Sequence, residues 1–214
     1  MRKWIPALLI IAAMAITLYM YPSLPDRVPT HFGMDGQANG WSSRLVGAWL
    51  VPFIMAVVWL ILRAAPHIDP RKENYEKFRG AYEIVVIATL AFMLVIHIVI
   101  LKSATGTQIP MDRFVFVGVG AFFVLIGFIL PRVHSNWFIG IRTPWTLTSN
   151  ESWERTHKAG GTLFVLIGLL AIISSLLVPH AAPWVLLASG LGAVVFLFVY
   201  SYRIWKNDPQ KRSL

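Results

Sequence analysis

The sequence NWFIGIRTPWTLTSNESWERTHK, residues 136–158, separates two apolar runs and carries far more side-chain chemistry than a plain connector needs. It holds three Trp, two Arg, one His and two Glu residues. The flanking runs, 114–130 and 160–178, contain no charged residue. Each approaches the roughly 20 apolar residues with which a helix crosses a bilayer core. The stretch is therefore predicted to be a structured loop between two membrane spans.

Runs of similar length recur along the chain and predict an all-α membrane protein with multiple spans. Helices are expected because the bilayer core offers no hydrogen-bond partners to unpaired backbone groups. Of the 214 residues, 57% are hydrophobic and 14% are charged, whereas about 25% charged is usual in a soluble domain. The six predicted transmembrane helices cover residues 4–21, 45–62, 84–101, 114–130, 161–178 and 183–202.

The distribution of Lys and Arg predicts the orientation in the membrane. With the amino terminus inside, only Arg27, Arg44, Lys102 and Arg113 of the 19 basic residues fall outside. By the positive-inside rule both termini are expected to be cytoplasmic. The loop at 22–44 is then extracellular and is called the outer loop, and the loop at 132–160 is cytoplasmic and is called the inner loop. The net charge of +9 is scattered between apolar runs, so no direct nucleic-acid partner is expected.

The second half of the inner loop has the pattern of a helix start. Thr148 and Glu151 have the spacing of a capping box, and Pro144 prevents a regular helix from running through the whole loop. We predict a short amphipathic interfacial helix near 150–158 that turns into the next span. Trp153 and His157, four residues apart, would share one face of that helix.

The first half of the inner loop places Arg142 between two Trp residues. The guanidinium could stack on Trp137 or Trp145 and serve recognition, or it could face lipid phosphate in an interfacial aromatic anchor. Both interpretations stay open. The candidate partner-binding residues of the loop are Asn136, Trp137, Gly140, Arg142, Thr143, Pro144, Trp145, Thr146, Trp153, His157 and Gly160.

The outer loop is rich in Pro and contains two turn dipeptides, Asp35-Gly36 and Asn39-Gly40. It is either a compact lid that meets a ligand arriving from outside or a stiff connector with Trp41 at the interface. His31 and Asp35 lack a third ligand for a metal ion. The candidate ligand-facing residues are Pro29, His31, Phe32, Asp35, Gly36 and Trp41.

Within the spans, His97 is the one ionisable residue that lies deep in an apolar run. It is either a neutral packing residue bonded to a carbonyl or a Thr, or a functional group. Spans four to six carry small residues, including Gly120, Gly127 and Gly168, that suit close helix contact. Such contact would form either inside one bundle or in a homo-oligomer.

Sequence signatures of catalysis are missing from the chain. Glu154 and His157 form half of a helical carboxylate and His pair, but the H-E-x-x-H pattern is incomplete. No P-loop, dinucleotide fingerprint or G-x-S-x-G motif occurs. We therefore expect no enzyme, no cofactor and no metal.

Two blocks of the sequence resemble a known family. The string NWFIGIRTPWTLTSxExWxxTHKxGG at 136–161 resembles the signature of the SdpI family, and LPDRVPTHFGMDGQANG at 24–40 is similar to an amino-terminal module of that family. The resemblance implies a two-span module at 1–64, a four-span module at 83–203 with the signature loop at 132–160, and a basic tail at 204–214.

The same resemblance implies a multi-pass protein of the bacterial cell membrane that gives immunity to a secreted, membrane-active peptide toxin by binding. In part of the family it also implies recruitment of a cytoplasmic transcriptional repressor. The expected partners are thus membrane lipid, the toxin and such a repressor. Two other classes remain: a small-molecule or ion transporter or channel, which needs polar groups along several spans, and a metal-dependent membrane hydrolase.

Overall fold

The computed structural model describes residues 4–211, so Arg2, Lys3 and Arg212 of the charge count lie outside the described residues. Six helices in this range are long and apolar enough to cross a membrane, which confirms the six-span prediction. They are α1 (Ile5–Met20), α2 (Arg44–Ile68), α4 (Arg79–Ala104), α5 (Met111–Ile129), α7 (Asn150–Leu177) and α8 (Ala182–Asn207). The short elements are α3 (Asn74–Lys77), α6 (Pro144–Thr148), and the 3-10 turns Tyr21–Ser23, Leu130–Arg132 and Pro179–Ala181.

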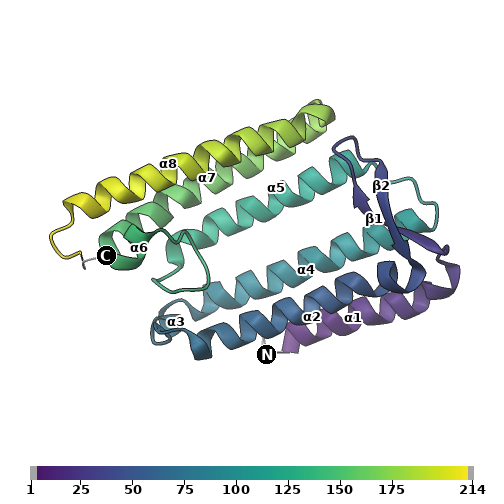
Figure 1. The fold of residues 1–214 in the computed structure, drawn as a ribbon, viewed down its shortest axis with the longest axis horizontal. Coiled ribbons are helices and arrows are strands. Elements are labelled where there is room, and N and C mark those ends of the chain that lie inside the picture. The colour runs from purple at the N-terminus through teal and green to yellow at the C-terminus, as the bar shows by residue number, and fades with distance from the viewer. Residues whose placement is uncertain (1–3, 212–214) are drawn as a thin grey trace.

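Successive long helices run in opposite directions, and the helices form two groups (Figure 1). Helices α1, α2 and α4 pack on one another, and α5 packs on α7, which packs on α8. The link between α2 and α4, which includes α3, lies at the same end of the bundle as α6. A β-hairpin lies at the opposite end. The two sequence blocks therefore sit at opposite ends of the molecule, while which end is cytoplasmic stays a prediction.

Helices α5 and α7 approach one another along a seam of glycines. A Cβ added at Gly127 would lie 2.7 Å from the carbonyl oxygen of Gly161, and one at Gly120 would lie 2.6 Å from that of Gly168. In each helix the two glycines are seven residues apart, so they repeat on one face after two turns. Glycine is needed here because any side chain would separate the backbones. These small residues serve contact within the chain.

The interfacial helix expected near 150–158 is not a separate element. Helix α7 begins at Asn150, as expected, but continues without a break to Leu177. Gly160 and Gly161 lie within this continuous helix and allow close packing, Gly160 against Ile141 and Gly161 against α5. At 1.5 Å per residue the 28 residues of α7 are about 42 Å long, which exceeds the hydrocarbon core of about 30 Å by about two turns.

The start of α7 also differs from the expected capping box. Ser149 is the N-cap residue, and its hydroxyl accepts a hydrogen bond of 2.9 Å from the amide of Ser152. The hydroxyl of Thr148 instead donates to the carbonyl of Pro144, 2.8 Å away. The capping box of this region belongs to α6, between Thr143 and Thr146.

The outer loop folds as a hairpin of β1 (Arg27–Phe32) and β2 (Ala38–Ser43), an element that the all-helical prediction lacked. Gly36, at φ +76°, makes the turn as expected. Asn39 and Gly40 lie within β2 and do not form the second turn. A Cβ at Gly36 would approach the amide of Asp112 at 2.8 Å, so the hairpin tip rests on the start of α5.

Candidate functional site

The inner signature loop is organised by the side chain of Asn136, which is fully buried. Its Oδ1 accepts hydrogen bonds from the amides of Phe138 and Ile139, at 2.9 and 2.8 Å. Its Nδ2 donates to the carbonyls of His134 and Ile139, at 2.9 and 3.0 Å. One amide side chain thus satisfies four backbone groups of an irregular segment, which gives the loop a single shape.

Asp69, directly after α2, ties this loop to the α1, α2 and α4 group. It is 2% exposed, and its Oδ2 accepts from the amide of Trp137 at 2.8 Å and from the hydroxyl of Tyr75 at 2.9 Å. Burial, reinforced by donation to Asp69, raises the pKa of the Tyr75 hydroxyl above its ordinary value of 10.0. The phenol therefore stays protonated and donates at neutral pH.

Arg71 and Asn74 extend the same connection. The guanidinium of Arg71 donates to the Ser135 hydroxyl and the Leu147 carbonyl, and its centre lies 5.9 Å from the ring centroid of Trp137. The side chain of Asn74 donates to the carbonyl of Ser135 at 2.8 Å. No role for the loop between α2 and α4 was predicted from the sequence, because Asp69 lies seven residues beyond the predicted span at 45–62 and its partner Trp137 lies 68 residues further along the chain.

Trp153 and His157 share a buried face of α7, as their spacing predicted. Their rings stack with centroids 4.0 Å apart at 20°, and the indole N–H donates to the carbonyl of Val133 at 2.7 Å. Nδ1 of His157 lies 2.8 Å from the carbonyl of Trp153, and Nε2 accepts from the amide of Ile141 at 3.0 Å. Both ring nitrogens are occupied, which assigns the neutral tautomer with the proton on Nδ1.

Gly140 lies directly over this imidazole. Its φ of +109° is a region that side-chain-bearing residues rarely adopt, and a Cβ there would clash with Nε2 of His157. The glycine therefore permits both the turn and the close approach to the ring.

A second network joins the loop to α8 through Ser201. Its hydroxyl accepts from Thr143 at 3.1 Å, and its carbonyl accepts from the Ser152 hydroxyl at 2.9 Å. At the end of α8, Asp208 accepts from the Ser149 hydroxyl at 2.5 Å. That bond and one from the Gln210 amide lower the pKa of Asp208.

The predicted partner-binding residues divide into a buried framework and an exposed surface. Trp137 is 47% exposed, and Arg142 and Pro144 are exposed as well. Arg142 donates to the carbonyl of Trp137 at 2.5 Å. Trp145 packs edge-on against Phe198, with centroids 4.5 Å apart. Asn136, Thr143, Thr146, Trp153, His157 and Gly160 are buried.

The predicted ligand-facing residues of the outer hairpin also differ in their exposure to solvent. Trp41 is 50% exposed, and His31 and Asp35 are exposed, whereas Pro29 is buried. Phe32 and Gly36 are half-buried. Nδ1 of His31 is hydrogen-bonded to the side chain of Asn39, and Oδ1 of Asp35 accepts from the amide of Gln37 at 3.0 Å. Local bonds within the hairpin thus hold these polar side chains.

His97 is fully buried where α4 meets α1 and α2. Its Nε2 lies 2.8 Å from the hydroxyl of Thr17, which is also 3.2 Å from the carbonyl of Ala48. A Thr was one of the two partners expected for a packing histidine. These two hydrogen bonds join α1, α2 and α4 at the Thr17 hydroxyl.

Across residues 4–211, no three His, Asp or Glu side chains are grouped so that they could hold a metal ion. Glu154 and His157 of the half motif point to different surroundings, since Glu154 is exposed and His157 is buried. The ion pair that forms on this part of α7 is Arg155 with Glu151, 2.9 Å apart.

Comparison with known proteins gives two family matches and one similar protein. Residues 132–201 match the SdpI/YfhL protein family, and residues 8–56 match a domain of unknown function, DUF1648. The Immunity protein SdpI of Bacillus subtilis (strain 168) is 21% identical over 208 residues, which cover 97% of this chain and 98% of that protein. No solved structure matches. Together with the six apolar helices, these similarities support a multi-pass protein of the bacterial membrane.

Proposed function

We propose, from the match of residues 132–201 to the SdpI/YfhL protein family, that this chain is an immunity protein that protects a bacterial cell from a secreted, membrane-active peptide toxin. The observation that carries the proposal is the similarity to Immunity protein SdpI along nearly the whole of both chains. A shared segment alone would support only a shared fold element. Here both sequence blocks and all six spans fall within the compared length.

Binding of the toxin is assigned to the outer hairpin. A membrane-active peptide presents apolar side chains, and the hairpin exposes Met34 and Trp41, at 56% and 50%. Large exposed apolar residues that are surrounded by polar residues are typical of surfaces that contact a partner. The hairpin is held on the bundle by Val28, which is fully buried and packs on Gly47 of α2, and by its tip on α5. It therefore offers a positioned surface to a ligand arriving at the membrane.

Recruitment of a cytoplasmic repressor is assigned to the exposed part of the inner loop. Arg142 carries a planar donor fork, of which one nitrogen bonds the carbonyl of Trp137. The neighbouring indole of Trp137 is half exposed, and Trp and Arg are enriched among residues that dominate protein interfaces. Asn136, Asp69 and His157 hold that surface from below by hydrogen bonds to the backbone.

Protection is tested by deleting the gene in its own host and challenging the cells with culture medium from the parent strain. We expect the deletion strain to lose membrane potential and viability, and a plasmid copy of the chain to restore both. Equal survival of deletion and parent strains across growth phases would overturn the immunity proposal. A plasmid copy with the hairpin tip, residues 33–37, replaced by a Gly and Ser linker separates toxin contact from folding, because membrane abundance is measured in parallel.

A further inference from the structure

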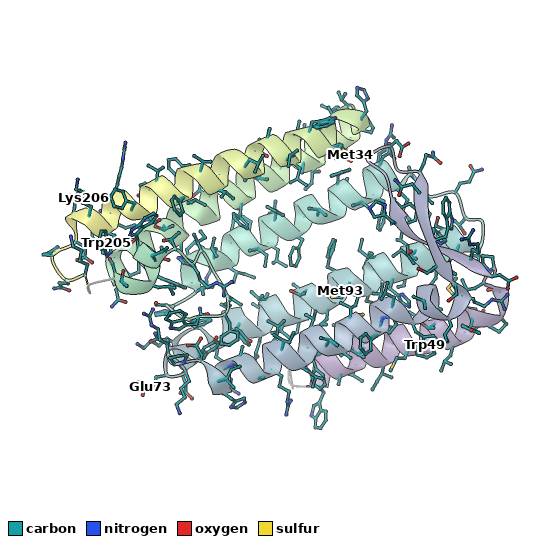
Figure 2. All side chains as sticks on the ribbon, viewed as in Figure 1. Met34, Trp49, Glu73, Met93, Trp205 and Lys206 are labelled. Atoms are coloured by element: carbon teal, nitrogen blue, oxygen red, sulfur yellow. The ribbon has the colours of Figure 1, made fainter. Side chains whose placement is uncertain are left out.

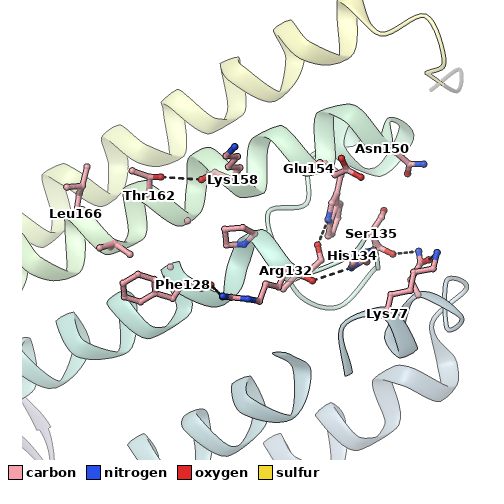
Figure 3. Close-up of a pocket in the computed structure, with 17 residues that line it drawn as sticks. Lys77, Phe128, Arg132, His134, Ser135, Asn150, Glu154, Lys158, Thr162 and Leu166 are labelled. Atoms are coloured by element: carbon pink, nitrogen blue, oxygen red, sulfur yellow. Dashed lines mark hydrogen bonds between the residues drawn. The ribbon is translucent and has the colours of Figure 1, made fainter. Parts of the chain in front are cut away.

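A pocket of about 900 Å³ lies at the inner-loop end of the bundle, between α3, the end of α5 and the first half of α7 (Figure 3). Side chains on α7 line it at every fourth position, so they form one row along the helix. That row runs from the loop end toward the middle of the bundle through Asn150, Glu154, Lys158, Thr162 and Leu166.

The polarity of the row changes along its length. Lys158 is charged, Thr162 is polar and Leu166 is apolar and 50% exposed. Eight residues separate Lys158 from Leu166, which corresponds to about 12 Å of helix rise. On the facing side, Arg132 follows the end of α5 and Phe128, 61% exposed, lies one turn further in. Both walls thus pass from cationic to apolar in the same direction.

The cationic end of the pocket has an excess of positive charge. Lys77, Arg132 and Lys158 line it together with one carboxylate, Glu154. The three cations are exposed, and within residues 4–211 none of them forms an ion pair with an acid. Arg132 donates to the carbonyl of Phe128, and Lys77 donates to the side chain of Asn74 at 2.9 Å. Both side chains keep further donors for an anion.

We propose that this pocket binds an anionic phospholipid, with the headgroup phosphate between Arg132 and Lys158 and an acyl chain along Phe128, Val165 and Leu166. Basic pockets between transmembrane helices suit lipid headgroups, and the apolar half of this one lies on the part of α7 that follows its last charged residue. An acidic peptide would match the cations but would leave the apolar walls uncovered. The proposal does not depend on toxin immunity.

The test uses the purified full chain in detergent and native mass spectrometry with phosphatidylglycerol or phosphatidylcholine of equal chain length. We expect phosphatidylglycerol to bind more tightly by about tenfold, because the basic residues attract a headgroup with a net negative charge. The double variant Arg132→Gln/Lys158→Gln should bind both lipids equally. The matched control is Arg203→Gln/Lys206→Gln, which removes two exposed charges from α8 at the same end of the bundle, outside the pocket.

A steric variant and two competitors distinguish the occupants. Thr162→Trp should weaken phosphatidylglycerol binding by blocking the apolar half while leaving the cations in place. Unchanged binding by this variant, equal binding of the two lipids by the wild-type chain, or an equal loss in the control would each overturn the proposal. Displacement of the lipid by inorganic phosphate, or by an acidic peptide at matched concentration, would show a soluble anion as the occupant and would also overturn it.

Discussion

The backbone N–H of Ile141 donates a hydrogen bond of 3.0 Å to Nε2 of His157, sixteen residues further along the chain. Because Nδ1 of the same ring is bonded to the carbonyl of Trp153, the imidazole connects the signature loop to the first turns of α7. In Figure 2 the labelled side chains of Glu73, Trp205 and Lys206 lie at this same end of the molecule. A histidine that sequence reasoning placed on a binding face is part of the framework beneath it.

His157→Ala should therefore destabilise the protein. The variant leaves the Ile141 amide without its acceptor and removes a ring stacked on Trp153, so we expect a loss of about 2–4 kcal/mol. Thermal unfolding in detergent measures the effect. His180→Ala, an exposed histidine at the other end of the bundle, is the control and should change stability by less than about 0.5 kcal/mol. Normal stability combined with lost function would make His157 a recognition residue.

Asp69→Ala should loosen the inner loop from the α1, α2 and α4 group. The variant leaves the Trp137 amide without its acceptor and leaves the buried Tyr75 hydroxyl with only its longer contact, 3.5 Å to Oδ1 of Asn136. We expect a cost of about 2–4 kcal/mol. The measurement is again thermal unfolding, now with Asp26→Ala as control, because the Asp26 side chain is 95% exposed and pairs with Arg44 at the surface. Equal stability of the two variants would contradict the role given to Asp69.

Arg142→Lys separates the two interpretations of the exposed loop. A lipid-phosphate anchor tolerates the change because Lys keeps the charge, whereas a planar contact to a partner carboxylate does not. We expect the variant to lose immunity or signalling while its abundance in the membrane stays unchanged. The binding free energy for the partner should weaken by about 1–3 kcal/mol. Arg155→Lys, at an exposed arginine paired with Glu151, is the matched control. Full activity of Arg142→Lys in a killing or reporter assay would favour the anchor.

The contact between Ser149 and Asp208 should be sensitive to acid. The pKa of Asp208 is lowered in the folded chain, so the carboxylate contributes stability above the ordinary carboxyl pKa of about 3.9 and loses it as pH falls toward the lower folded value. The difference in melting temperature between wild type and Asp208→Asn should therefore be present at pH 6 and shrink below about pH 4. A difference that does not change with pH would show that the charge of Asp208 is irrelevant.

Orientation in the membrane follows from reporter fusions. A reporter after Gln37, in the hairpin, should read as external, and one after Asn150, at the start of α7, as cytoplasmic. Reversed readings would move the immunity surface to the inner loop. Readings on the same side for both reporters would contradict the odd number of spans, α2, α4 and α5, between the two positions.

Apolar length was sufficient to predict the six spans, and helical periodicity was sufficient to predict the common face of Trp153 and His157. Pro144 and the polar residues after it placed a helix start near Asn150, although the capping residue is Ser149 and not Thr148. These features depend on residues within one or two turns of each other, so the sequence by itself determined them. Gly36 was recognisable as a turn residue for the same reason, since its backbone conformation is a local property.

Only the tertiary structure decided which signature residues are buried and which face outward. The carboxylate that holds Trp137 belongs to Asp69, 68 residues earlier, and the hydroxyl that accepts from Thr143 belongs to Ser201, 58 residues later. Likewise only the structure shows that Gly160 and Gly161 lie within the continuous helix α7 and contact Ile141 and α5. Hydrogen-bond partners on separate helices come together only when the helices pack, and the spacing of residues along the chain does not predict that packing.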